Sequence, residues 1–156
     1  MRQRAELRRR ASLPAGLLLL ALAQPGAAQA DRTDAHCLAL SMYFEARDDG
    51  RPGMEAVGWV ILNRLESPDF PDTVCAVVQD GGEMPPCQFH WWCDGKSDQP
   101  AEDEPWRLAR EVADQLLTDP PPDPTGTALF FHATEIDPPW ADLERTAEIG
   151  THVFYR

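Results

Sequence analysis

The segment Cys37-Leu-Ala-Leu-Ser-Met-Tyr-Phe-Glu-Ala-Arg47 decides how the rest of this chain is expected to fold. Before its last residue the segment is apolar except for Ser41 and Glu45, and it contains no proline or glycine. Residues 47–52 then include a glycine and a proline, which end regular structure. A helix that is apolar on every side must be buried. The sequence therefore predicts a core helix over 37–46, with Glu45 at its end.

Glu45 has two interpretations on this segment alone. Carboxylates are almost never fully buried without a partner or a task. In the structural interpretation, Glu45 pairs with Arg47 or Arg64, or it points into water. In the catalytic interpretation, the apolar surroundings disfavour the charged form and raise the pKa of the carboxyl. The side chain then keeps a proton near neutral pH and donates it as a general acid.

Residues 1–30 predict a secretory signal peptide that is not part of the fold. A leader with five arginines precedes an apolar run over 13–23, and an Ala-x-Ala site ends at Ala30. The run is too short for a permanent membrane anchor. We expect a free mature protein that begins near Asp31, in the periplasm or outside the cell. Arg8-Arg9-Arg10 leaves twin-arginine export open beside the general secretory route.

The charge of the chain limits its partners. The whole chain carries a net charge of −12, and removal of the leader, with five arginines and one glutamate, leaves −16. A surface this acidic argues against nucleic acid or anionic lipid as a partner. Residues 31–156 are long enough for one compact domain with its own core. No repeat or internal boundary is present in this region, and we expect a monomer.

Helical periodicity predicts three further helices. The run Met54 to Leu65, after a turn over 50–53, has apolar residues at helical spacing, and Gly58 within it indicates a close helix–helix contact. A short helix is expected over 74–78, capped by Asp72 or Thr73. Pro105 to Leu117 is the clearest amphipathic helix. Its predicted apolar face consists of Leu108, Val112, Ala113, Leu116 and Leu117.

The last third of the chain predicts strands. Residues 118–126 contain four prolines and cannot form regular structure. The segments 127–133 and 150–156 are each typical of a strand. Helices come first and a small antiparallel sheet comes late, which defines an α+β protein.

The segment Cys87-Gln-Phe-His-Trp-Trp-Cys-Asp-Gly95 differs from the rest because three aromatic residues and a histidine lie between two cysteines. It is short and flanked by turn residues, so we expect a strand or an ordered loop. Its tryptophans have two interpretations. They fill space in a loop closed by a disulfide, or they offer flat apolar faces to carbohydrate rings.

The four cysteines predict disulfides in an exported protein, with three connectivities open. A zinc site would need close pairs of cysteine or histidine, whereas Cys87 and Cys93 lie six residues apart and the four histidines are scattered. We therefore expect no metal and no cofactor. The expected pairs are Cys87–Cys93, which closes a short loop, and Cys37–Cys75, which ties the Glu45 helix to the short helix.

Several segments, taken in order, resemble the SleB-type cell-wall hydrolases, which include the spore cortex-lytic enzymes. The matching segments are Tyr43-Phe44-Glu45-Ala46-Arg47, Ala56-Val57, Val60-Ile61-Leu62-Asn63-Arg64, Thr73-Val74-Cys75, Cys87-Gln88-Phe89 with Trp91, Cys93-Asp94-Gly95, Phe131-His132-Ala133, Ile149-Gly150 and His152-Val153-Phe154-Tyr155-Arg156. The resemblance covers essentially all of residues 31–156. Departures from the family pattern are Asp48-Asp49 for the usual Gly-Glu, Met54 for glutamine and His90 for serine.

The resemblance implies a lysozyme-like α+β domain, mainly helical, that cleaves the glycan strands of peptidoglycan with Glu45 as the catalytic acid. It also favours Gln88, Phe89 and Trp91 as residues that form the cleft. The full set of expected substrate contacts is Tyr43, Gln88, Phe89, Trp91, Trp92, His132, Trp140 and Tyr155.

The reaction type depends on how many carboxylates take part. Most glycosidases use two, but Glu55, Asp94, Asp123 and Glu135 all lie in polar or turn-like stretches. One carboxyl suffices if the 6-hydroxyl of N-acetylmuramic acid attacks C1 of its own ring, and we expect this lytic transglycosylation. Hydrolysis by a water that Asp94 or another group holds remains the alternative. A third interpretation is a peptidoglycan-binding module without catalysis, in which the tryptophans form a platform.

Overall fold

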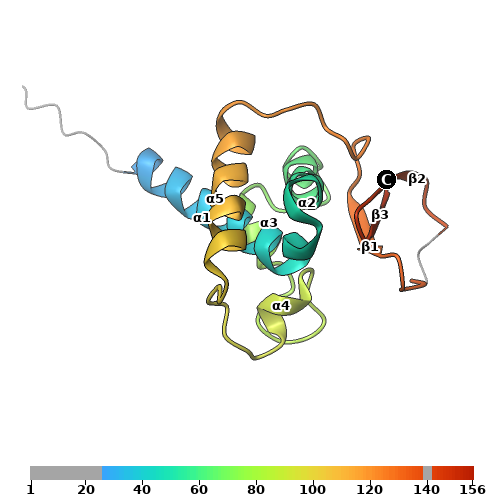
Figure 1. Cartoon of the computed structure of the whole chain (residues 1–156), viewed down its shortest axis with the longest axis horizontal. Coiled ribbons are helices and arrows are strands. Elements are labelled where there is room, and N and C mark those ends of the chain that lie inside the picture. The colour runs from blue at the N-terminus through green and yellow to red at the C-terminus, as the bar shows by residue number, and fades with distance from the viewer. Residues whose placement is uncertain (1–25, 139–141) are drawn as a thin grey trace, which may run out of the picture.

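The computed structural model describes residues 26–138 and 142–156. The helical part comes first and a three-stranded sheet follows it at one side (Figure 1). This order confirms the predicted α+β class. Most of the predicted leader lies outside the described residues, so the signal peptide stays a prediction. Among the described helices, none combines the length and apolar character needed to cross a membrane.

Helices and strands do not alternate along the described part of the chain. The helices are α1 (Gly26–Ala46), the 3-10 turn η1 (Arg47–Asp49), α2 (Gly50–Leu65), α3 (Val74–Val78), α4 (His90–Cys93) and α5 (Asp103–Thr118). The strands follow as β1 (Phe130–Ala133), β2 (Arg145–Ile149) and β3 (His152–Tyr155).

Helix α1 is the centre of the helical core, as its sequence predicts. It packs against α2, α3 and α5, and Leu38 and Met42 are fully buried. Gly58 of α2 faces α1 and α5 so closely that an added Cβ would lie 2.4 Å from Leu116 and 3.0 Å from Met42. The predicted role of Gly58 in close helix packing is therefore confirmed.

The break after α1 is confirmed, but the expected turn over 50–53 is wrong. Helix α2 begins at Gly50 rather than at Met54, so the turn residues form its first turn. Pro52 is tolerated there because the first N–H groups of a helix have no partner within the helix. The chain between α1 and α2 is thus reduced to the three residues of η1.

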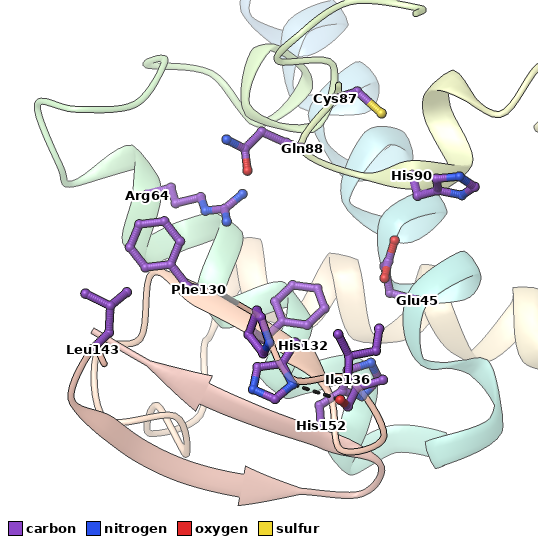
Figure 2. A pocket seen from close by; sticks show the side chains of 13 residues that line it. Glu45, Arg64, Cys87, Gln88, His90, Phe130, His132, Ile136, Leu143 and His152 are labelled. Atoms are coloured by element: carbon purple, nitrogen blue, oxygen red, sulfur yellow. Dashed lines mark hydrogen bonds between the residues drawn. The ribbon is translucent and has the colours of Figure 1, made fainter. Parts of the chain in front are cut away.

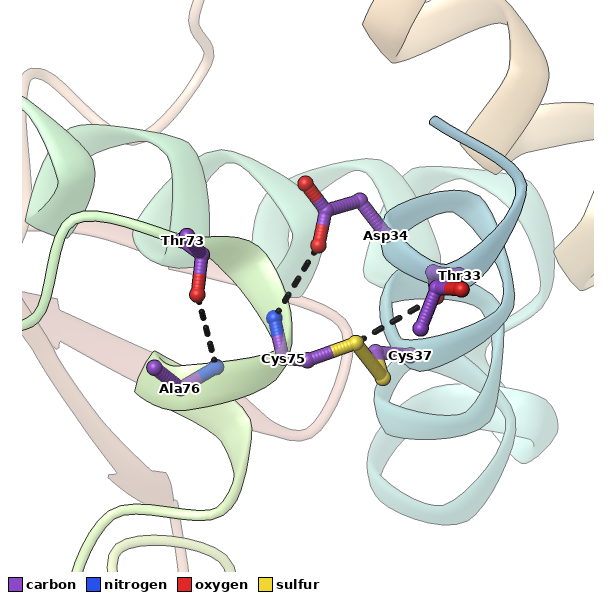
Figure 3. The surroundings of a disulfide bond; sticks show 6 residues. All are labelled: Thr33, Asp34, Cys37, Thr73, Cys75 and Ala76. Carbon is purple, nitrogen blue, oxygen red and sulfur yellow. Dashed lines mark hydrogen bonds between the residues drawn. A yellow bond between two sulfur atoms is a disulfide. The ribbon is translucent and has the colours of Figure 1, made fainter. Parts of the chain in front are cut away.

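The disulfide between Cys37 and Cys75 joins α1 to α3, with the two Cα atoms 5.3 Å apart (Figure 3). Thr73, rather than Asp72, caps α3: its hydroxyl oxygen accepts a hydrogen bond from the Ala76 N–H at 3.2 Å. Cys87 pairs with Cys93, so both predicted pairs are present.

The strand or loop predicted over 87–95 is wrong, because α4 occupies its centre. Cys87 and Cys93 lie six residues apart, yet their Cα atoms are separated by only 6.3 Å. Six extended residues would span roughly 20 Å. The bridge therefore excludes a strand and leaves a compact helical turn.

Helix α5 is confirmed, although it begins at Asp103 and its buried face differs by one position at each end. Ala109 is buried, whereas Leu117 is 39% exposed and does not belong to the face as predicted. In a helix of 3.6 residues per turn, Leu117 lies 100° from Leu116 and points away from α1.

The sheet has the strand order β1-β3-β2 and is antiparallel throughout. Both predicted strands are present but shorter than expected, and β1 begins at Phe130 because Thr127 has a φ of 64°. Strand β2 was not predicted. It is the exposed edge of the sheet and turns into β3 through Gly150, whose φ is 59°. All four residues of β3 are buried.

Candidate active site

Glu45 lies in the last turn of α1, on the wall of a pocket of about 720 Å³. Cys87, Gln88 and His90 form another part of the wall, and residues 130–133 of β1 face it from the sheet (Figure 2). The pocket thus lies between the helical part and the sheet. Among the described residues that line it, Glu45 is the only one with a carboxylate.

Burial raises the pKa of Glu45 from about 4.5 to about 7. The residue makes no hydrogen bond or ion pair within 26–138 and 142–156 that would offset this loss of solvation. The two arginines of the structural interpretation are occupied elsewhere. Arg47 pairs with Glu102 at 3.1 Å, and the Nε of Arg64 donates to the Leu129 carbonyl at 2.8 Å. The predicted pairing of Glu45 with either arginine is therefore wrong.

Asp49 connects the end of α1 to the sheet. Its carboxylate accepts hydrogen bonds from the Thr151 N–H at 3.0 Å and the Thr151 hydroxyl at 2.9 Å, and its Oδ2 lies 3.0 Å from Nδ1 of His152. Burial alone would raise the pKa of Asp49, but these hydrogen bonds and the His152 charge together hold it below its usual value. Because His152 lines the pocket, this contact fixes one wall relative to Glu45.

Two of the predicted substrate contacts, Gln88 and His132, line the pocket. Gln88 is exposed, and the ring of His132 is half-buried. Tyr155 stands behind this wall: its hydroxyl lies 3.0 Å from Nε2 of His132 and the two rings stack at 5.3 Å. Tyr155 itself is buried and does not line the pocket, so it holds His132 rather than facing a ligand.

Tyr43 and Phe89 do not line the pocket, contrary to the expectation that they contact substrate. Tyr43 precedes Glu45 by two residues, which places it about 200° away around α1. Its hydroxyl accepts hydrogen bonds from the N–H groups of Ala101 and Glu102 at 3.0 and 3.1 Å. Phe89 is 2% exposed and points into the core, on the side opposite to its neighbour Gln88.

The tryptophan platform is likewise not found at this pocket. Trp91 is buried and stacks on Phe44 with ring centroids 4.9 Å apart, and Trp92 meets Trp91 edge to face. Trp91 belongs to the core around α1, and Trp92 is half-buried and packs against it. The space-filling interpretation therefore holds for these two rings. Trp140 lies outside the described residues.

Several pocket residues were missed by the sequence prediction. His152 and Arg64 lie in segments that matched the family pattern, but no local pattern assigns them to the pocket. His90 and Phe130 were also missed, and His90 stands where the family pattern has serine. These residues meet at the pocket because of contacts between residues far apart in sequence. An example is the contact of Asp49 with His152, which lies 103 residues later.

Asp94, which would bind the attacking water in the hydrolytic alternative, lies outside the pocket lining. Its carboxylate accepts a hydrogen bond from the Lys96 N–H at 2.8 Å and pairs with the Lys96 ammonium at 3.2 Å. Asp123 is bound to Thr125 and Asn63 and is also absent from the pocket lining. Both carboxylates have structural partners. Hydrolysis through Asp94 therefore has no geometric support.

The fold and site define a small α+β domain with a half-buried carboxyl, the only one among the described lining residues, on a pocket between helices and sheet. A family model described as Cell Wall Hydrolase matches residues 48–155, and the chain therefore belongs to the cell wall hydrolase family. The matched range begins three residues after Glu45, so the role of Glu45 is argued from its position and surroundings.

The chain is similar to curated spore cortex-lytic enzymes. The enzyme of Bacillus subtilis is 32% identical over 123 residues, which cover 78% of this chain and 37% of the relative. The enzyme of Halalkalibacterium halodurans is 35% identical over 123 residues, with coverages of 78% and 34%. The chain thus spans little more than a third of the length of these relatives.

Two solved structures have similar folds. The catalytic domain of the Bacillus cereus SleB protein matches with a TM-score of 0.64 and 28% identity, and the match covers 80% of this chain and 91% of that domain. The catalytic domain of the germination-specific lytic transglycosylase SleB from Bacillus anthracis also gives 0.64 and 28%, with coverages of 86% and 100%. The SleB-type resemblance of the sequence is therefore confirmed.

Proposed function

We propose that this chain cleaves the glycan strands of peptidoglycan by lytic transglycosylation, with Glu45 as acid and then base. The observation that carries the proposal is a carboxyl whose pKa is raised to about 7 on a pocket with no second carboxylate among its described lining residues. Membership of the cell wall hydrolase family supports the substrate class. The substrate implies a location in the periplasm or outside the cell.

In the first step, the protonated Glu45 donates its proton to the glycosidic oxygen while the bond from that oxygen to C1 of N-acetylmuramic acid breaks. The leaving sugar departs with a new hydroxyl group. Burial of Glu45 favours the protonated form that this step needs.

In the second step, the 6-hydroxyl of the same N-acetylmuramic acid attacks C1, and its proton passes to the Glu45 carboxylate. The product is a 1,6-anhydro ring, and Glu45 regains the proton that it lost. No water is consumed. A single carboxyl on the pocket is sufficient for both proton transfers.

Hydrolysis is the second candidate, and the contact of His152 with Asp49 favours it. When His152 is neutral and its Nδ1 donates to Asp49 at 3.0 Å, Nε2 of the ring is left as a proton acceptor. A water activated by such an acceptor would replace the 6-hydroxyl. A peptidoglycan-binding module without catalysis would need no carboxyl that donates a proton, so the raised pKa of Glu45 favours cleavage over this alternative.

Mass spectrometry of the products of purified sacculi separates these candidates. Muropeptides that end in 1,6-anhydro-N-acetylmuramic acid are the expected result. Reducing N-acetylmuramic acid ends without anhydro ends would retain Glu45 as acid but replace transglycosylation with hydrolysis. Sacculi that bind the protein and stay turbid would overturn both forms of cleavage and favour the binding module.

A further inference from the structure

Arg64 is a buried cation at the C-terminal end of α2. Its residue surface is 4% exposed, and its guanidinium carbon lies 4.8 Å from the centroid of the Phe70 ring and 5.9 Å from that of Phe130. Its Nε donates to the Leu129 carbonyl at 2.8 Å. These contacts hold the guanidinium plane in place and use only one of its three nitrogens.

The remaining part of the guanidinium lacks a hydrogen-bonding partner. Nη1 is buried and has no hydrogen-bond partner within the described residues, and Arg64 forms no ion pair there. Burial lowers the pKa of Arg64 to about 10, against the opposing charge of Asp80, so the side chain stays charged at neutral pH. A buried cation with unused donors is costly unless an anion meets it.

Arg64 also lines the pocket of Glu45. Figure 2 shows Arg64 and Gln88 at one end of the pocket and Glu45 on the other side. Among the described lining residues, Arg64 is the only lysine or arginine. Glu45 and Arg64 are separate groups on the same pocket, so they can contact different parts of a bound chain.

We propose that Arg64, together with the amide of Gln88, forms a subsite for a carboxylate of the glycan substrate. The proposal rests on the proposed function. The sugar backbone of peptidoglycan is neutral, and its carboxylates belong to the lactyl group of muramic acid and to the peptide stem. A guanidinium binds a carboxylate through two parallel N–H donors. The protein surface is acidic overall, so this cation provides the local attraction for such a group.

The test measures binding by the full chain carrying Glu45→Gln, which leaves the glycan intact. Four soluble glycans are compared: strands with peptide stems, strands stripped to free lactyl carboxylates, and the form of each in which the carboxylates are converted to amides. We expect the carboxylate form to bind about 10–100-fold more tightly than its amide, the scale of a charge-assisted hydrogen bond. The glycan with the larger ratio identifies the source of the carboxylate.

Arg64→Gln should make the affinities for the carboxylate and the amide equal. Arg64→Lys should retain part of the preference for the carboxylate, because the charge stays while the planar guanidinium is lost. Arg107→Gln is the matched control. It removes one positive charge, as Arg64→Gln does, but Arg107 lies on α5, where it pairs with Glu104. Equal binding of carboxylate and amide by the chain with Arg64 intact would overturn the subsite, whether or not the Arg64 variants fold.

This result is distinguishable from a failure of the proposed function. Cleavage with no preference for carboxylates contradicts the subsite alone. A carboxylate preference that depends on Arg64, in a chain that releases no anhydro ends, contradicts the transglycosylation alone.

Discussion

Glu45 and Asp49 are four residues apart at the junction of α1 and η1, yet their carboxyls behave in opposite ways. Glu45 has no partner among the described residues, and burial raises its pKa to about 7. Asp49 accepts hydrogen bonds from Thr151 and contacts His152, and its pKa is held below the usual value. Partners rather than sequence position thus separate a carboxyl with a raised pKa from a structural anion with a lowered one.

The difference also shows how the site is assembled. Glu45 ends the central helix of the apolar core, and residues 130–133 of β1 face it across the pocket. Asp49 instead crosses to the turn before β3 and holds the opposite wall of the pocket. One carboxyl is therefore the proposed proton donor because it is unpaired, and the other positions the walls because it is paired.

The largest expected effect is on catalysis. Glu45→Gln keeps the shape of the side chain but cannot transfer a proton. Clearing of purified sacculi should fall by about 10²–10⁴-fold, the usual scale of general acid–base catalysis. Glu55→Gln is the matched control, because Glu55 pairs with Arg51 at 3.4 Å and does not line the pocket. Near-normal clearing by a folded Glu45→Gln protein would refute the assignment.

The same substitution should stabilise the protein above neutral pH. A carboxyl with a raised pKa holds its proton in the folded state after the unfolded state has ionised, so the free energy of unfolding falls as pH rises from about 4.5 to about 7. Glu45→Gln removes this loss, which amounts to up to about 3 kcal/mol. Denaturant unfolding at pH 8 and at pH 4 measures it. A variant less stable than the wild type at pH 8 would mean that Glu45 has a structural partner.

Asp49→Asn should act in the opposite direction. The loss of charge-assisted hydrogen bonds should lower the free energy of unfolding by about 1.5–3 kcal/mol at pH 7. Because the pKa of Asp49 is lowered by folding, its contribution exists above the unfolded pKa and is lost as pH falls through the folded one. Thermal unfolding at pH 7 and at low pH follows this change. Asp48→Asn, at an exposed neighbour, is the control, and equal stability of the two variants at pH 7 would contradict the clamp.

Local patterns in the sequence were sufficient for most of the helical half of the fold, although α4 and the first turn of α2 were missed. The apolar run of α1, the periodicity of α2 and α5 and the cap at Thr73 each depend on residues close together in the chain. The apolar run also singled out Glu45, but it left a structural and a catalytic interpretation open, and the family resemblance favoured the catalytic one. Both disulfide pairs were also predicted: the sequence left three connectivities open, and the expected one joins the two cysteines nearest in the chain and then the remaining two.

The sheet and the pocket wall depend on distant contacts, and there the sequence was less informative. Strand β2 has exposed Arg145 and Glu148 and forms only because β3 supplies a partner. The tryptophans of segment 87–95 were expected to contact substrate, because composition does not tell which face of a short helical turn a ring occupies. Tyr43 was misassigned for the same reason. It precedes Glu45 by only two residues on α1, yet it faces the core while Glu45 lines the pocket.

The most direct test of the account is a measurement of the Glu45 pKa. Carbon-detected NMR of the side-chain carboxyls would follow Glu45 and Asp49 in one titration from about pH 3 to pH 9. The account predicts a Glu45 midpoint near 7, an Asp49 midpoint below the ordinary aspartate value of about 3.9, and activity that falls with the Glu45 midpoint as pH rises. A Glu45 midpoint near 4.5, with activity unchanged through neutral pH, would contradict it.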